Sequence, residues 1–259
     1  MEGLEQYLDE VFYEELGKIV SALVVDKRIG LSANPRAILL GGQSGAGKTT
    51  LHNIFRTAMK NNVVVINGDE YRAFHPQYRR ISEKYGIDAP AHTAEWAGRM
   101  VEAVVDTLSI TGYNLIIEGT LRTSEVPLKT ATLLRGRGYK VSLALMAVKP
   151  EISLVSCQLR YEQMRIAGTA PRAVDPAHHL SIVEGIVKNL EVLEDSGLFD
   201  SVSLYARNEQ RLFPSDDVES QGRACEALER ILFGDWTEEE CGHLTYLERR
   251  LSETCNSSS

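Results

Sequence analysis

The chain has 259 residues, enough for one large α/β domain with additions or for two small domains. Hydrophobic residues make up 43% and charged residues 25%, and the formal net charge is −8. This acidic balance argues against a broad nucleic-acid or membrane-surface footprint, so neither partner is expected. No apolar run approaches a membrane span, and the amino terminus lacks the basic-then-apolar order of a signal peptide. Four cysteines without metal-site spacing are typical of reduced thiols, so we expect a cytoplasmic protein.

The first predicted element is an amphipathic helix over residues 3–26, where apolar residues recur at three- and four-residue steps. Its apolar stripe is expected to pack on the main domain, with partner binding as the alternative. Short, β-branched runs then predict five strands, at 36–41, 63–67, 113–118, 140–147 and 201–205. Helical patterns fall at 48–60, 91–110, 125–136, 150–166, 176–195, 216–232 and 237–252.

This alternation predicts an α/β fold of the P-loop kinase-like kind, with an open, mainly parallel five-stranded sheet and helices on both faces. We expect a single domain, 1–259, because the last helices are too short to build a separate core. Its parts are a core, a lid region and a C-terminal helical extension, at 36–206, 150–176 and 215–252. Ligands of such sheets bind beyond the carboxyl ends of the strands, so the chemistry is expected there.

The stretch after the first strand is the most informative, because Gly42-x4-Gly47-Lys48-Thr49 fits the phosphate-binding loop pattern without a mismatch. Glycines let the backbone turn its N–H groups toward anionic oxygens, and the next helix adds its positive dipole end. Lys48 is expected to reach the β- and γ-phosphates of ATP, and Thr49 to ligate Mg²⁺. The alternative is a flexible Gly/Ser loop. The residues expected to hold the nucleotide are Gly42, Gln43, Ser44, Gly45, Ala46, Gly47, Lys48, Thr49 and Thr50.

Asp69 follows the second strand, so its carboxylate is expected beside the phosphate loop. It could accept a proton from a substrate hydroxyl or help to hold Mg²⁺ through water. The alternative is that Asp69 caps a helix beginning near Glu70, since aspartate is a favoured cap. Arg72 lies close behind Asp69.

Glu118 ends the third strand, and Thr120 and Arg122 follow it toward the same edge of the sheet. A glutamate at the end of a buried strand is costly unless it is paired or functional. The three side chains offer acceptors for sugar hydroxyls and a cation for a phosphate-bearing acceptor. A structural ion pair between Glu118 and Arg122 is the alternative.

Two arginines come after the fourth strand, Arg160 on the helix and Arg172 in a Gly/Pro-marked segment. Such a pair is typical of a mobile lid that closes over ATP and neutralises charge at the migrating phosphoryl group. Glu102 interrupts the apolar stripe of its helix and could point either to solvent or to the site.

These motifs together resemble the zeta toxins of bacterial toxin–antitoxin pairs, and the likeness to their PezT-type branch covers nearly the whole chain. The segments that carry it are Gly41–Thr50, Asn67–Asp69, Phe74–Pro76, Trp96–Glu102, Ile117–Thr123, Arg160–Glu162 and Leu232–Trp236. The phosphate loop is shared widely among kinases, whereas Glu-Gly-Thr-Leu-Arg and Ala-Gly-x-Met-Val-Glu are far more specific. The chain departs from the family at Asn67, often Asp there, and around Arg172.

The resemblance implies the toxin of a type II toxin–antitoxin system. Such a toxin is an ATP-dependent kinase that phosphorylates UDP-N-acetylglucosamine on the 3′-hydroxyl of the amino sugar and so blocks peptidoglycan synthesis. It also implies that Lys48 and Thr49 bind ATP and Mg²⁺, and that Asp69 is the base. Arg160 and Arg172 would clamp phosphates. Residues implied to shape the sugar-nucleotide site are Asp69, Glu102, Glu118, Thr120 and Arg122. A small helical antitoxin would obstruct the nucleotide site.

Two other functions fit the local chemistry. One is a P-loop kinase of another small hydroxyl substrate, such as an antibiotic or a metabolite, because the motifs alone support only a small-molecule phosphotransferase. The other is a non-catalytic, nucleotide-dependent binding switch. The chain lacks the Asn-Lys-x-Asp guanine-reading motif, which disfavours a switch.

Overall fold

The computed structural model describes residues 3–29, 35–169, 173–214 and 222–256. Within these ranges one sheet has the strand order β2-β3-β1-β4-β5-β6. The neighbouring strands are parallel except for β6, which is antiparallel to β5. The predicted α/β fold with a mainly parallel sheet is confirmed, and β6 is an additional strand of three residues. The strands are β1 (Arg36–Gly41), β2 (Val64–Ile66), β3 (Leu115–Glu118), β4 (Lys140–Met146), β5 (Ser201–Tyr205) and β6 (Arg211–Phe213).

The longer helices follow the predicted pattern closely. They are α1 (Asp9–Val24), α2 (Thr49–Ala58), α6 (Ala94–Ile110), α7 (Glu125–Gly136), α8 (Pro150–Ile166), α9 (Pro176–Asp195), α10 (Ala224–Phe233) and α11 (Glu238–Asn256). Short helical pieces join β2 to α6. They are α3 (Gly68–Tyr71), η1 (Arg72–Phe74), α4 (Tyr78–Tyr85), η2 (Gly86–Asp88) and α5 (Ala89–His92).

The first helix begins later than predicted, because Leu8 before it has an extended backbone. The residues ahead of α1 instead lie against α6, where the Tyr7 ring packs edge-on against Trp96 with 4.7 Å between ring centroids. The helix predicted over 216–232 begins at Ala224 in the described chain, and positions 216–221 lie outside it.

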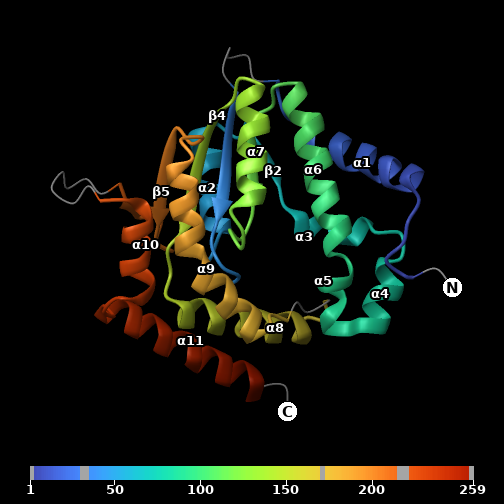
Figure 1. Ribbon diagram of the computed structural model, residues 1–259. Helices are drawn as coiled ribbons and strands as arrows, with labels where there is room; N and C mark the ends of the chain where they lie inside the picture. Colours follow the sequence, from blue (N-terminus) through green and yellow to red (C-terminus); the bar gives the residue numbers. More distant parts are fainter. Residues whose placement is uncertain (1–2, 30–34, 170–172, 215–221, 257–259) are drawn as a thin grey trace.

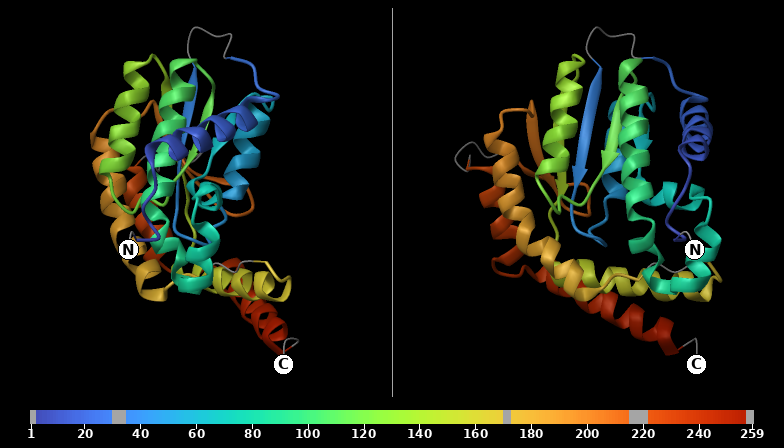
Figure 2. Two further views of the ribbon diagram at one scale, coloured as in Figure 1. Left: turned by 90° about the vertical axis from the view of Figure 1, so that its right-hand side faces the viewer. Right: turned by 45° about the vertical axis from the view of Figure 1, so that its right-hand side comes forward.

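Helices cover both faces of the sheet (Figures 1 and 2). Buried side chains of α1, α6, α7, α9 and α10 form one apolar core with one face of the sheet, including Trp96, Leu134 and Leu228. Side chains of α2, α8 and α11 form a second core on the other face. The apolar stripe of α1 therefore packs on the main body, as predicted.

Helices α8 and α11 run past the carboxyl ends of the strands (Figure 1). Lys149, just before α8, is 1% exposed and fastens the connection between α10 and α11. Its Nζ donates to the carbonyls of Gly234 (2.7 Å) and Asp235 (3.2 Å) and lies 5.5 Å from the ring centroid of Trp236. Burying an ammonium group requires such partners.

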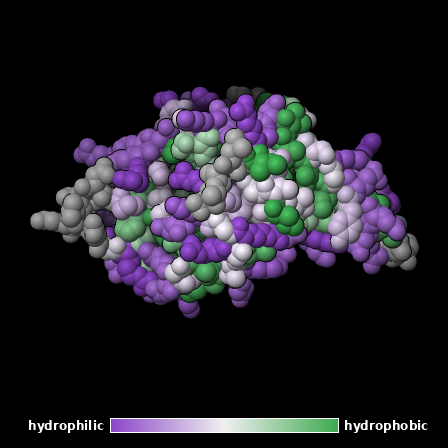
Figure 3. Space-filling model, turned by 90° about the horizontal axis from the view of Figure 1, so that it is seen from above, coloured by the Kyte–Doolittle hydropathy of each residue, from purple (hydrophilic) through white to green (hydrophobic). Residues whose placement is uncertain are grey.

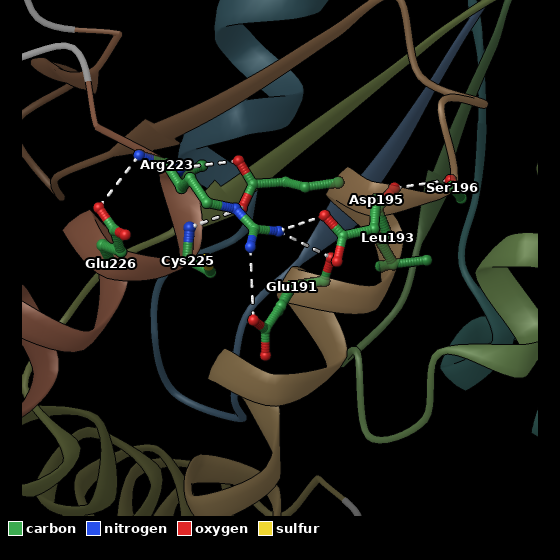
Figure 4. Close-up of polar contacts among 9 residues, drawn as sticks. Glu191, Leu193, Asp195, Ser196, Arg223, Cys225 and Glu226 are labelled. Carbon is green, nitrogen blue, oxygen red and sulfur yellow. Dashed lines mark hydrogen bonds and ion pairs between the residues drawn. The ribbon is translucent and has the colours of Figure 1, made fainter.

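Helix α10 is fixed to α9 by Arg223, whose guanidinium reaches Glu191 and Asp195 (Figure 4). The carboxylate of Glu194 accepts hydrogen bonds from the backbone N–H groups of Ala224 and Cys225 at the start of α10. These bonds satisfy donors that a helix start leaves free.

Figure 3 looks onto the amino ends of the strands, and apolar side chains there are interspersed with hydrophilic ones. Among the described helices, none is both long and apolar enough to cross a membrane. The carboxyl ends of the strands, where the predicted site residues gather, lie on the side of α8 (Figure 1).

Candidate active site

The phosphate-binding loop joins β1 to α2, and its glycines are required by its shape. Gly42, Gly45 and Gly47 have backbone φ angles of 131°, 78° and 96°. Residues other than glycine rarely adopt such angles. A Cβ atom on Gly45 would lie 2.1 Å from the carbonyl oxygen of Ser153, so the loop passes directly against α8. The alternative of a flexible loop does not fit this close approach.

Gln43 anchors the loop from within the protein. Its side chain is fully buried, and its Nε2 donates to the carbonyl of Val148 (2.8 Å) and to Oγ of Ser153 (3.2 Å). Nε2 of His179 on α9 lies 2.9 Å from the same Ser153 Oγ. Gln43, predicted to bind nucleotide, therefore has a side chain that holds the loop against the β4–α8 junction.

Lys48 lies at the end of the loop, and Thr49 begins α2. The Lys48 Nζ donates to the carbonyls of Gly42 (2.9 Å) and Gln43 (3.3 Å) and lies 3.8 Å from Oε1 of Glu118. Burial lowers the pKa of the ammonium group, whereas the carboxylates of Glu118 and Asp69 raise it.

Glu118 faces the phosphate loop because β3 is parallel to β1 and Glu118 pairs in register with Leu40, just ahead of the loop. Its Oε2 lies 3.1 Å from Nε2 of His52 on α2. The alternative of a structural Glu118–Arg122 pair does not match these contacts, since the carboxylate lies between Lys48 and His52.

Asp69 lies in α3, directly after β2. The helix is capped by Asn67, whose side chain accepts a hydrogen bond from the Asp69 N–H, so the interpretation of Asp69 as the cap is wrong. The carboxylate of Asp69 is half exposed and accepts a bond from Nε of Arg72 (2.9 Å). Arg72 in turn donates to the carbonyl of Pro90 (2.6 Å), which ties this carboxylate to α5.

The remaining predicted residues of the acceptor side are less enclosed. Thr120 and Arg122 lie in the loop after β3, which Asn189 of α9 holds by donating to the carbonyl of Arg122 (2.8 Å). Glu102 is 56% exposed and pairs with Lys129 of α7 at 2.8 Å, so it does not point into the buried part of the site.

Arg160 lies on α8 and is exposed. Its positive charge nevertheless lowers the pKa values of Lys48 and of the Cys157 thiol. Burial raises the pKa of Cys157, while Arg160, Lys48 and Arg207 each lower it. Three cations thus act on one thiol beside the loop, and their combined positive charge favours binding of an anion. Arg172 lies outside the described residues.

Sequence reasoning missed two side chains of this site. No motif in the sequence indicates His52, although it lies against Glu118. Arg207 follows β5 and donates from Nη2 to the carbonyl of Gly45. The rule that ligands bind at strand ends could have indicated Arg207, since it is the second residue after β5.

The order β2-β3-β1 brings Asp69, Glu118 and the phosphate loop to three adjacent strand ends. An anion-binding loop with a lysine then lies beside a carboxylate that can take a proton. This combination suits transfer of a phosphoryl group to a hydroxyl.

Sequence comparison finds known proteins that are similar to this chain over most of its length. A sequence model of the family described as Zeta toxin matches residues 22–217. Toxin PezT of Streptococcus pneumoniae is 42% identical over 251 residues, which is 96% of this chain and 98% of that protein. Toxin zeta of Streptococcus pyogenes is 35% identical over 221 residues, covering 85% of this chain and 76% of that protein.

Solved structures show the same likeness. A structure of the PezAT chromosomal toxin–antitoxin system of Streptococcus pneumoniae matches with a TM-score of 0.87 and 39% identity, covering 98% of this chain and 100% of that chain. A structure of the AvrRxo1-ORF1:-ORF2 complex with ATP has a TM-score of 0.54 and 13% identity, covering 95% and 88%. At that identity the second likeness concerns the fold alone.

Proposed function

Because the chain belongs to the zeta toxin family, we propose that it is the toxin of a bacterial type II toxin–antitoxin pair and acts as an ATP-dependent kinase. The substrate is UDP-N-acetylglucosamine, which receives a phosphate on the 3′-hydroxyl of its amino sugar. The product would block peptidoglycan synthesis. The observation that carries this proposal is the placement of the phosphate loop, Glu118 and Asp69 at three adjacent strand ends, with Nζ of Lys48 3.8 Å from Oε1 of Glu118.

In this mechanism the backbone N–H groups of residues 42–50 bind the phosphates of ATP, and Lys48 neutralises charge on the β- and γ-phosphates. Asp69, oriented by Arg72, accepts the proton of the sugar hydroxyl as its oxygen attacks the γ-phosphorus. The new O–P bond replaces the bond to the β–γ bridging oxygen, and ADP leaves. Arg160, with Arg172 from the lid region, neutralises the charge that spreads over the transferred group.

Hard oxygen donors at this edge of the sheet fit Mg²⁺: Thr49 begins α2 beside the loop, and the Asp69 carboxylate follows β2, two strands away in the order β2-β3-β1. Thr49 would hold the Mg²⁺, with Asp69 helping through water, and the ion would supply positive charge that withdraws electrons from the phosphates.

On the acceptor side, Thr120 and Arg122 contact the sugar nucleotide from the loop after β3. Glu118 and Glu102 shape that part of the site, Glu102 from the exposed face of α6. The antitoxin is a small helical protein that covers the nucleotide site. The match to the PezAT toxin–antitoxin structure supports such a partner.

The test is incubation of the purified chain with Mg-ATP and a panel of hydroxyl acceptors, followed by mass spectrometry. UDP-N-acetylglucosamine is expected to gain one phosphate, and the Lys48→Ala variant is expected to transfer none. Phosphorylation of an antibiotic or metabolite instead, with UDP-N-acetylglucosamine unchanged, would refute the proposed acceptor. ATP binding with no transfer, but with a change in partner affinity, would indicate a switch.

A growth experiment tests the toxin role separately. Expression of the chain alone is expected to stop growth of its bacterial host, and expression of Lys48→Ala is expected to leave growth normal. Equal growth of both cultures at equal protein levels would contradict the role.

A further inference from the structure

Arg207 connects three segments that are far apart in the sequence. Its Nη2 donates to the carbonyl of Gly45 in the phosphate loop and to Oγ of Ser156 on α8, the latter at 2.9 Å. Its Nη1 lies 3.2 Å from Nε2 of His243 on α11. One guanidinium group therefore holds the loop, the helix behind it and the C-terminal helix together.

The surroundings of Arg207 do not neutralise its charge. Its three partners are a carbonyl, a hydroxyl and an imidazole, and its Nε is buried without a hydrogen-bond partner among the described residues. Burial lowers the pKa of the guanidinium, as expected for a cation moved out of water. Such a group costs free energy in the folded chain, which favours a functional reason for it.

The stem of Arg207 follows the loop as well. A Cβ atom on Gly47 would lie 3.6 Å from its Cγ. Ser156 and Arg160 are four residues apart on α8 and so share one face of that helix. By bonding both Gly45 and Ser156, Arg207 sets the distance between the phosphate loop and the turn of α8 that carries Arg160.

We propose that Arg207 is a positioning residue that holds the phosphate loop open to a triphosphate, and that α11 supports it through His243. Nη2 donates to two protein acceptors, Nη1 lies against His243 and Nε is buried, so Arg207 acts through the loop and not by contact with the phosphates. The inference rests on the proposed function for the use of ATP, but it does not depend on the acceptor.

The test is calorimetric titration of the full chain with Mg-ATP in the absence of acceptor. Arg207→Met, which keeps the stem and removes the donors, is expected to weaken ATP binding by about tenfold or more, since charge-assisted bonds are lost. Arg207→Lys keeps the charge without the fork and is expected to fall between. His243→Leu is expected to weaken binding several-fold, whereas His243→Gln, whose side-chain oxygen can accept from Nη1, retains the parental affinity.

The matched control is Arg249→Ala, which removes a cation that is 69% exposed on the same helix and should leave ATP binding unchanged. Melting temperatures identify any variant that fails to fold, and if Arg207→Met does, the comparison of the two His243 variants decides. Parental affinity in folded Arg207→Met, or equal affinities in His243→Leu and His243→Gln, would overturn the inference. A parental chain that binds ATP but phosphorylates no acceptor would refute only the proposed function. A parental chain that binds no ATP would refute both.

Discussion

Nζ of Lys48 and Oε1 of Glu118 lie 3.8 Å apart, an ion pair that joins the phosphate loop to the end of the neighbouring strand. The two side chains are 10% and 20% exposed, so solvent and salt screen their attraction weakly. Burial lowers the pKa of the lysine, and the Glu118 carboxylate opposes this effect. An arriving triphosphate must therefore replace Glu118 as the nearest anion to Lys48.

This relationship predicts a pH effect in the Glu118→Gln variant. Without the Glu118 carboxylate, the lowering of the Lys48 pKa by burial is opposed less, so the ammonium group loses its proton at a lower pH than in the parental chain. ATP affinity is expected to decline with rising pH earlier in the variant, as measured by titrations between about pH 6.5 and 9. Glu95→Gln, at an exposed carboxylate of α6, is the control. Parallel pH profiles for Glu118→Gln and the parental chain would contradict the role of Glu118.

Replacement of Asp69 by Asn is expected to separate chemistry from binding. Loss of a general base lowers kcat by about 10²- to 10⁴-fold, whereas the affinity for ATP stays near the parental value. Glu70→Gln removes the adjacent exposed carboxylate and should leave both unchanged. A parental rate in Asp69→Asn would show that Asp69 is not the base.

Lys149→Met is expected to loosen the C-terminal helices, because the carbonyls of Gly234 and Asp235 lose their buried donor. Leaving such groups unsatisfied costs about 1–3 kcal/mol of unfolding free energy. Urea denaturation measures the loss, and faster proteolysis near residue 235 would locate it. Lys129→Met, at a side chain 70% exposed, should change neither. Equal stability of the two variants would contradict the proposed anchor.

Three histidines that are buried or half-buried make the unfolding free energy depend on pH near neutrality. Burial lowers the pKa values of His75, His179 and His243 below the ordinary value of 6.5. As the pH falls through about 6.5, the unfolded chain takes up these protons before the folded one, so the unfolding free energy decreases. The urea midpoint is expected to drop between about pH 7.5 and 5.5. His179→Gln should flatten this dependence more than His178→Gln does, because His178 contributes only its charge to the lowered pKa of His179. The reverse result would refute the assignment.

Much of the fold could be predicted because its signals are local. The helices at 125–136, 150–166 and 176–195 and the strands at 36–41 and 201–205 have the predicted bounds, since each is a continuous periodic or apolar run between turn signals. The pieces between β2 and α6 are only one or two turns long, too short for a periodicity to emerge. β6 has three residues and depends on its pairing with β5.

The site residues that could be predicted are likewise those with a local sequence signal. The phosphate loop could be predicted because its chemistry requires glycines at fixed spacing. Asp69 and Glu118 could be predicted because each is a polar residue at the end of an apolar strand. The ion pair of Glu118 with Lys48 could not be predicted, because it depends on β3 being the neighbour of β1 in the sheet. Arg207 carries no motif, and its contacts with α8 and α11 arise only when residues 51 and 36 positions away fold against it.

The lengths of the outermost strands bear on how the molecule behaves in a crowded cell. β2 and β6, the two borders of the sheet, have three residues each, whereas β4 inside it has seven. An edge strand this short exposes few unpaired amide and carbonyl groups with which a strand from another molecule could pair. The sheet therefore offers little opportunity for aggregation through its edge strands, even at a high concentration of the protein.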